Sequence, residues 1–179
     1  MNDLILRAAR LATTVHNGQK RKCSHFIDEP YIFHPMRVSG LVTLSSQVTY
    51  EIAAAAWVHD TIEDAKNPDE VRQVIKDQLG YVVYHYVEEL TNASKTDLTM
   101  KGKSRAERKA ADRAKIATIS KASKIIKLAD RVDNLREAIS NPKTPADWLK
   151  TYIEESKMLF AVLQGTDDFL ERHLTGLLN

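Results

Sequence analysis

The apolar residues of this chain recur at spacings of three and four along almost its whole length. In the first segment Leu4, Ala8 and Leu11 follow this spacing, and later segments repeat it. Residues at these spacings share one face of an α-helix. The alternation of apolar and polar residues that marks a half-buried strand is weak everywhere, and residues 81–84, which also suit a strand, have helical neighbours. The sequence therefore predicts an all-α fold.

Start and stop signals divide the chain into roughly nine helices. Asn67, Pro68 and Glu70 combine a capping residue, a proline in the first turn and a glutamate at the third position. Ser104 and Glu107 have the spacing of a capping box. We expect helices near residues 4–17, 35–45, 50–58, 68–80, 81–90, 104–120, 125–139, 145–165 and from 166 onward, with loops at 19–33 and 92–103.

The size and charge of the chain favour a single domain over residues 1–179. An apolar fraction of 43% in 179 residues is enough for one packed core, and no repeat or low-complexity linker divides the sequence. The net charge of +2 argues against a protein that binds nucleic acid or a membrane surface. A pI near 8.6 leaves room for a local basic pocket that faces an anion.

The cysteine count and the N-terminal residues bear on location. Cys23 is the single cysteine, so a disulfide within the chain is excluded, which fits a reducing compartment. The first ten residues lack the basic and apolar segments of a signal peptide, and no apolar run approaches the roughly 18 residues of a membrane span. We expect a soluble cytoplasmic protein. The sequence leaves open whether it is a monomer or a homo-oligomer.

Residues 57–64 read W-V-H-D-T-I-E-D and complete one of the most apolar runs in the chain; their ionisable members are His59, Asp60, Glu63 and Asp64. On a helix, His59 and Asp60 point about 100° apart, so they could bind one ion only at the helix edge. Glu63 and Asp64 lie one turn further on if the helix continues. The alternative is a solvated acidic helix end, but acidic residues at a helix C-terminus oppose the helix dipole.

Two further residues could complete a metal site with His59 and Asp60. His34 stands at a junction between a loop and a helix, and Asp130 lies off the apolar stripe of a later helix. Two histidines and two aspartates offer nitrogen and oxygen donors, a set that suits Mn²⁺, Fe²⁺ or Zn²⁺. Four ligands on an octahedral ion leave two positions for a water and a phosphate oxygen, and the two downstream carboxylates would orient or deprotonate that water.

Three motifs together resemble the hydrolase domain of RelA/SpoT-type alarmone enzymes, within the HD phosphohydrolase superfamily. They read P-Y-I-F-H-P over residues 30–35, H-D-T-I-E-D over 59–64 and K-L-A-D-R-V-D-N-L over 127–135. A lone His-Asp pair is weak evidence, whereas the three motifs in this order and spacing are specific. The resemblance is strongest to the stand-alone small alarmone hydrolases, such as the metazoan SpoT homologs.

The resemblance implies an enzyme that removes pyrophosphate from the 3′ position of (p)ppGpp, with Mn²⁺ bound, to give GDP or GTP. Nine positions match functional residues of the family. The implied metal ligands are His34, His59, Asp60 and Asp130. The implied catalytic pair is Glu63 and Asp64, and the implied substrate contacts are Arg21, Lys22 and Asn134. Residues 94–97 also resemble a segment that lines the family's pocket.

Two other functions stay open at the level of the sequence. One is a related HD phosphatase that acts on an adenosine alarmone or on NADPH, which carry similar phosphate groups on the ribose. The other is a catalytically silent nucleotide sensor. A protein that only binds a nucleotide would not need Glu63 and Asp64, so retention of this pair favours an enzyme.

Overall fold

The computed structural model describes residues 3–21, 28–96 and 98–179, and the regular structure of these residues is helical. Nine of its helices have nine or more residues: α1 (Leu4–Val15), α2 (Phe33–Val42), α3 (Tyr50–Val58), α5 (Pro68–Leu79), α6 (Tyr81–Leu90), α8 (Arg105–Thr118), α9 (Lys121–Ser140), α10 (Ala146–Leu163) and α11 (Asp168–Leu178). Three shorter elements complete it: α4 (Thr61–Asp64), α7 (Ala93–Thr96) and the 3₁₀ turn η1 (Leu98–Met100). The prediction of an all-α fold of roughly nine helices is confirmed.

The helix starts follow the capping signals of the sequence. The side chain of Asn67 accepts a hydrogen bond from the backbone N–H of Glu70 at the start of α5. Ser104 and Glu107 form both bonds of a capping box at the start of α8. Gly80 separates α5 from α6 and has a φ of 89°, a backbone conformation that glycine adopts readily and other residues rarely adopt. Local chemistry therefore fixes these boundaries before any tertiary contact forms.

The stretch predicted as a loop at residues 92–103 contains α7 and η1 instead. The reason is a contact from a distant part of the chain. Asp112 of α8 accepts hydrogen bonds of 3.0 Å from both the backbone N–H and the hydroxyl of Ser94. This carboxylate satisfies donors at the start of α7 that the polar local sequence leaves open.

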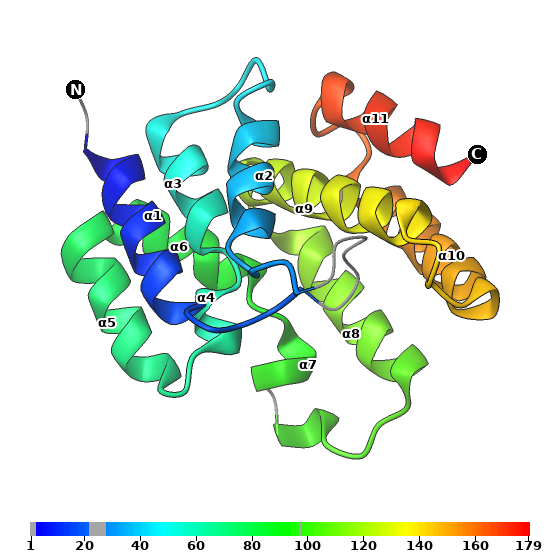
Figure 1. The fold of residues 1–179 in the computed structure, drawn as a ribbon, viewed down its shortest axis with the longest axis horizontal. Coiled ribbons are helices and arrows are strands. Elements are labelled where there is room, and N and C mark those ends of the chain that lie inside the picture. Colours follow the sequence, from blue (N-terminus) through cyan, green and yellow to red (C-terminus); the bar gives the residue numbers. More distant parts are fainter. Residues whose placement is uncertain (1–2, 22–27, 97) are drawn as a thin grey trace.

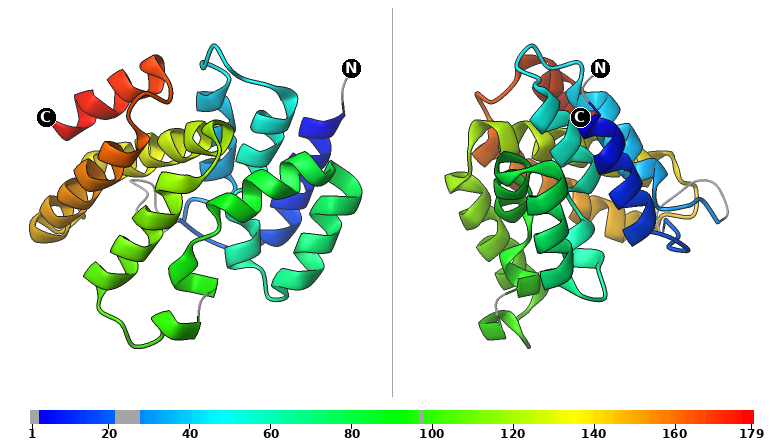
Figure 2. Two further views of the ribbon diagram at one scale, coloured as in Figure 1. Left: turned by 180° about the vertical axis from the view of Figure 1, so that it is seen from behind. Right: turned by 90° about the vertical axis from the view of Figure 1, so that its left-hand side faces the viewer.

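Two helices organise the core. α3 contacts α1, α2 and α6, and α9 contacts α2, α10 and α11 (Figure 1). The residues of α3 from Ile52 to Ala56 are buried on every side, which is why this segment lacks a polar face. Figure 2 shows α7 and α8 side by side at one end of the molecule. The start of α2, the end of α3 and the middle of α9 meet inside this frame.

No helix within the described residues is both long enough and apolar enough to cross a membrane.

Candidate metal centre and catalytic site

The helix under the H-D-T-I-E-D motif does not continue through it. α3 ends at Val58, and the four-residue α4 begins at Thr61. The imidazole Nδ1 of His59 lies 2.8 Å from the carbonyl oxygen of Ala56, and the Thr61 hydroxyl donates to the carbonyl of Val58 at 2.7 Å. These side-chain bonds satisfy carbonyls of the last turn of α3, so the chain can turn at Asp60 and start a new helix.

Four predicted metal ligands come together here, from α2, from the turn between α3 and α4, and from α9. The ligand atoms of His34, His59 and Asp130 all lie within 4.8 Å of one another. The Oδ2 atom of Asp60 lies 3.1 Å from Nε2 of His59 and 3.5 Å from Nε2 of His34. Both imidazoles and Asp130 are at least 95% buried. Residues almost 100 positions apart therefore converge on one small buried volume.

The hydrogen bonds of the two histidines leave one nitrogen of each ring free. Nδ1 of His34 lies 2.7 Å from a carboxylate oxygen of Asp133, and Nδ1 of His59 is held by Ala56. The Nε2 atoms of both rings are buried and have no hydrogen-bond partner within the described part of the chain. An N–H at Nδ1 leaves a lone pair at Nε2, the form in which histidine binds metals. With the carboxylates of Asp60 and Asp130, this set fits a divalent metal ion.

The electrostatics of the cluster also call for a cation. Burial lowers the pKa of His34, but Asp130, Asp133 and Asp60 outweigh burial and raise it to about 9. Burial likewise lowers the pKa of His59, yet Asp60 and Asp130 raise it well above its ordinary value. A proton and a divalent cation compete for the same Nε2 atoms, so metal affinity at this cluster depends on pH.

The predicted acidic pair lies on α4, next to the cluster. The Glu63 carboxylate is almost fully buried and accepts a hydrogen bond from the backbone N–H of Asn92. Nζ of Lys95 lies 2.5 Å from Oε2 of Glu63 and 3.7 Å from Oδ1 of Asp64. Burial lowers the pKa of Lys95, but Glu63 and Asp64 raise it above its ordinary value. The more exposed Asp64 side chain is about one-quarter accessible.

Sequence and structure comparisons agree with this geometry. A profile of the HD domain matches residues 8–168. Guanosine-3′,5′-bis(diphosphate) 3′-pyrophosphohydrolase MESH1 of Mus musculus is 33% identical over 178 residues, covering 97% of this chain and 92% of the mouse protein. The chain is an HD-domain protein of the MESH1 family.

Further relatives span most of the same HD domain. MESH1 of Drosophila melanogaster is 30% identical and covers 94% of this chain and 89% of its own. The solved structure of a metazoan ortholog of SpoT, described as hydrolysing ppGpp and acting in starvation responses, superposes with a TM-score of 0.84. It is 27% identical and covers 99% of this chain and 94% of its own. The resemblance to the small alarmone hydrolases, predicted from the three motifs, is confirmed.

The HD domain holds its histidine and aspartate ligands through a further set of contacts that sequence reasoning missed. The Tyr31 hydroxyl donates to Oδ2 of Asp60 at 2.6 Å. Burial and the Asp60 charge raise the Tyr31 pKa, so the hydroxyl keeps its proton and remains a donor. Arg37 donates from Nε to Asp133 at 2.7 Å, on the carboxylate that faces His34. The D-x-x-D spacing in the third motif could have identified Asp133, since it places both aspartates near one helix face.

The third motif of the HD domain supplies two contacts to Asp130. Lys127 lies one turn earlier on α9, and its Nζ is 2.8 Å from Oδ2 of Asp130. The Asn134 side-chain amide donates to the other oxygen, Oδ1. Burial raises the pKa of Asp130, but Lys127 and the two imidazoles of the cluster lower it well below its ordinary range. Asp130 is therefore ionised and fixed from both sides.

Two of the three predicted substrate contacts, Arg21 and Asn134, lie beside the cluster. Arg21 donates to Asn134 through Nη2 and to Glu137 through Nε, so these two predicted residues touch. Arg21 is about 10% exposed at its side chain. Lys22 lies outside the described residues. The roles assigned to Arg21, Lys22 and Asn134 stay predictions.

Proposed function

We propose that this protein hydrolyses the 3′-pyrophosphate of (p)ppGpp to GDP or GTP and pyrophosphate, in a reaction that requires Mn²⁺. The observation that supports this most is the pair of buried Nε2 atoms, on His34 and His59, that face carboxylates and have no other partner in the described chain. A second pair of carboxylates lies beside them on α4. The curated relatives named for this activity cover nearly the whole chain.

A divalent cation bound at this cluster supplies Lewis-acid chemistry, because it neutralises phosphate charge and lowers the pKa of a water. The chain's own residues do the remaining work. Asp64, the more accessible of the acidic pair, accepts a proton from the attacking water at a carboxylate oxygen. Glu63 is fixed by Asn92 and Lys95 and holds that water in line. The protonated ammonium of Lys95 donates to Glu63 and lies close to the carboxylate of Asp64.

The products of ppGpp test the reaction directly. We expect GDP and intact pyrophosphate, resolved by ion-exchange chromatography, and no early orthophosphate. In ¹⁸O-labelled water the label should enter pyrophosphate and be absent from GDP, because the 3′ oxygen of the ribose leaves. Orthophosphate as the primary product, or label in GDP, would overturn the assignment of the bond that breaks.

The same assay tests which metal the reaction requires and which nucleobase the enzyme prefers. Chelator treatment should abolish turnover, and Mn²⁺ should restore it better than Mg²⁺, Fe²⁺ or Zn²⁺. A comparison of kcat/KM for ppGpp, its adenosine counterpart and NADPH identifies the preferred base and phosphate position. No turnover of any of the three in the Mn²⁺-loaded protein, with measured nucleotide binding, would favour a sensor over an enzyme.

A further inference from the structure

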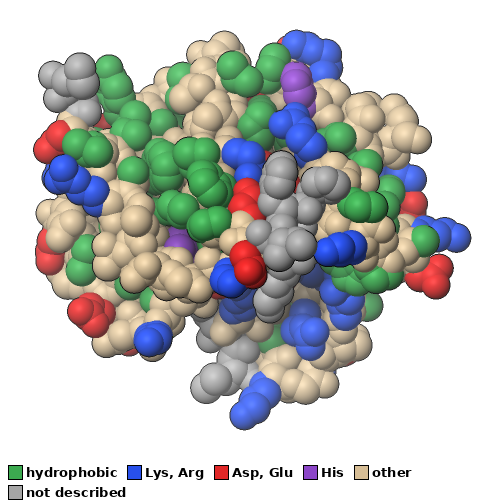
Figure 3. All heavy atoms as spheres, in the orientation of Figure 1, with side chains coloured by type: hydrophobic (Ala, Val, Ile, Leu, Met, Phe, Trp, Pro, Cys, Tyr) green, Lys and Arg blue, Asp and Glu red, His purple; other side chains and the backbone are tan. Residues whose placement is uncertain are grey.

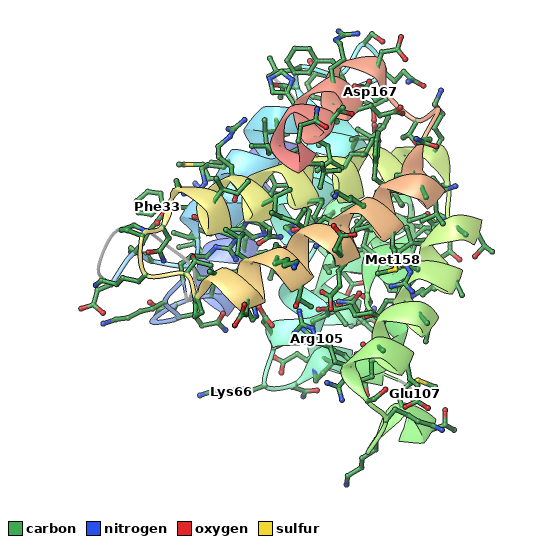
Figure 4. All side chains as sticks on the ribbon, turned by 90° about the vertical axis from the view of Figure 1, so that its right-hand side faces the viewer. Phe33, Lys66, Arg105, Glu107, Met158 and Asp167 are labelled. Atoms are coloured by element: carbon green, nitrogen blue, oxygen red, sulfur yellow. The ribbon has the colours of Figure 1, made fainter. Side chains whose placement is uncertain are left out.

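A second buried compartment lies next to the metal cluster, between α8, α9 and α10. It has a volume of about 50 Å³, several times the roughly 10–15 Å³ that one water needs. Figure 4 views the molecule from the side on which these three helices lie. We call it the basic cavity, because its charged lining residues are Lys109, Arg113, Lys127, Arg131, Asp112 and Glu155. Four cations and two carboxylates leave an excess of two positive charges.

Both carboxylates of the basic cavity already have other partners. Asp112 accepts two hydrogen bonds from Ser94, at its backbone N–H and its hydroxyl. Glu155 is bound by Arg105 through two hydrogen bonds of 2.6 and 2.9 Å. The nearest contact between the cavity's opposite charges, from Lys109 to Asp112, is 4.0 Å. Lys127 pairs with Asp130 at 2.8 Å, outside the lining, so the weakly neutralised cations of the cavity are Lys109, Arg113 and Arg131.

Arg131 is the residue of the basic cavity that is best suited to bind an anion. The residue is 8% exposed, and no carboxylate within the described residues forms an ion pair with it. Nη1 donates to the Ser156 hydroxyl at 3.1 Å, and the guanidinium lies 4.8 Å from the ring centre of Tyr152. Nε is buried and has no partner in the described structure. A guanidinium in this state has free N–H groups that match phosphate oxygens.

Lys109 and Arg113 extend the same excess of positive charge. Burial lowers the pKa of Lys109, and the nearby charges of Arg131 and Lys127 lower it further, while Asp112 opposes the shift. Arg113 has no ion pair with any described residue and lines the same cavity. Lys and Arg side chains also gather on the surface over α8 (Figure 3). The positive potential thus continues from the interior to the face of the molecule.

Two residues belong to both the basic cavity and the catalytic site. Lys127 lines the cavity and lies 2.8 Å from Oδ2 of Asp130, a predicted metal ligand. Asn92 lines the cavity and donates its backbone N–H to Glu63. The cavity is therefore one side chain away from the metal cluster on one side and from the acidic pair on the other. One extended ligand could occupy both.

We propose that the basic cavity binds a second phosphate group of the nucleotide substrate, its 5′-diphosphate, while the 3′ phosphate chain lies at the metal cluster. This inference rests on the proposed function, since it takes the substrate class from it. The cavity supplies three things that a diphosphate requires: two guanidinium groups, of Arg113 and Arg131, that form no ion pair with a described carboxylate, a buried guanidinium N–H without a partner, and a space adjoining the reacting centre. It makes the enzyme selective for nucleotides phosphorylated at both ends of the ribose.

The test compares two substrates in the Mn²⁺-loaded protein. One is ppGpp, and the other is guanosine 3′-diphosphate with a free 5′ hydroxyl. The double variant Lys109→Gln/Arg113→Gln removes two cavity charges. Arg108→Gln is the matched control, because Arg108 precedes Lys109 on α8 and its exposed side chain donates to the Lys103 carbonyl, outside the cavity. We expect the ratio of kcat/KM for ppGpp to that for the 5′-hydroxyl analogue to fall at least tenfold in the double variant and less than twofold in the control.

An unchanged ratio in a double variant that still folds, or an equal loss on both substrates, would overturn the inference. Thermal unfolding monitors folding, and the single variant Lys109→Gln, with an expected three- to fivefold fall in the ratio, replaces the double variant if that one does not fold.

A binding measurement separates this failure from a failure of the proposed function. Calorimetric titration of inorganic pyrophosphate in excess chelator should give an affinity that drops at least fivefold in the cavity variant and is unchanged in the control. If the wild type turns over neither substrate but shows this difference, the proposed function fails and the anion site stands. Equal pyrophosphate affinity in all three proteins removes the anion site, even where turnover of ppGpp is found.

Discussion

Two neighbouring sites in the molecule suit ions of opposite charge: the metal cluster, which is the set of candidate ligands His34, His59, Asp60 and Asp130, and the basic cavity. The cluster suits a cation, because the buried Nε2 atoms of His34 and His59 lie among carboxylates. The cavity suits an anion, because Arg131 and the other cations line it. A buried charge without a partner costs several kcal/mol, so a fold retains one where a ligand supplies the partner. The pairing of the two compartments fits a substrate whose phosphates need both.

The largest expected effect comes from removing a ligand of the cluster. Asp130→Asn replaces a charged oxygen with a neutral amide, so bound Mn²⁺ should be lost and turnover should fall by about 10³-fold or more. Metal content by elemental analysis and kcat/KM are measured on the same sample. Pyrophosphate binding in chelator should survive, because the cavity keeps its charges. A variant with full metal content and normal turnover would remove Asp130 from the ligand set.

The next effect separates chemistry from metal binding. Glu63→Gln and Asp64→Asn should each keep the metal and the substrate but lower kcat by about 10²-fold, the scale of a lost general base. Single-turnover rates are compared with metal content. Loss of the metal in either variant would move that residue from catalysis to ligation. Glu63→Gln also removes the negative charge that pairs with Lys95 at 2.5 Å.

A smaller effect is expected from the residue that orients His34. Asp133→Asn weakens the 2.7 Å contact at Nδ1, so Mn²⁺ affinity should fall by roughly 10- to 100-fold, while kcat at saturating metal changes little. Metal titration followed by activity measures both quantities. Asp147→Asn, at the exposed start of α10, is the control. Equal metal affinity in Asp133→Asn and wild type would mean that packing alone fixes the imidazole.

The sequence predicted the helices with local capping signals, but not the elements that depend on contacts between distant residues. Helix periods and capping boxes are local, so the signals around Asn67 and Ser104 predicted α5 and α8 directly. The short α7 depends on Asp112 from another helix, and local sequence carries no sign of that contact. The break between α3 and α4 arises from side-chain bonds of His59 and Thr61 to backbone carbonyls, which a regular helical period does not reveal.

The ligand set emerged from motifs, whereas its surroundings did not. The four residues predicted as metal ligands lie close together in the structure, although their roles remain predictions. Tyr31 lies in the first motif, yet nothing in its sequence position indicates that its hydroxyl holds Asp60. The basic cavity was invisible in the sequence, because its cations come from two helices whose crossing only the fold defines.

The smallest expected effect concerns the loop before the first motif. Arg21→Ala and Lys22→Ala should raise KM about tenfold with little change in kcat, the lower end of the roughly 1.5–3 kcal/mol of a charge-assisted contact. Arg21 touches Asn134, so the two variants Arg21→Ala and Asn134→Ala should not be additive. Lys20→Ala, exposed and paired with Asp28, is the control. Kinetics within twofold of wild type in both variants would remove these residues from the substrate contacts.

One 20-residue helix, α9, carries residues of both compartments at fixed angular positions. Lys127, Asp130, Arg131 and Asn134 depend on a rotation of about 100° per residue to point where they do. Insertion or deletion of a single residue upstream in α9 would turn all four away together, and no repacking of neighbours could restore one without displacing another. Related chains are therefore expected to vary in length before Lys121 or after Ser140, and to keep an unbroken count between them.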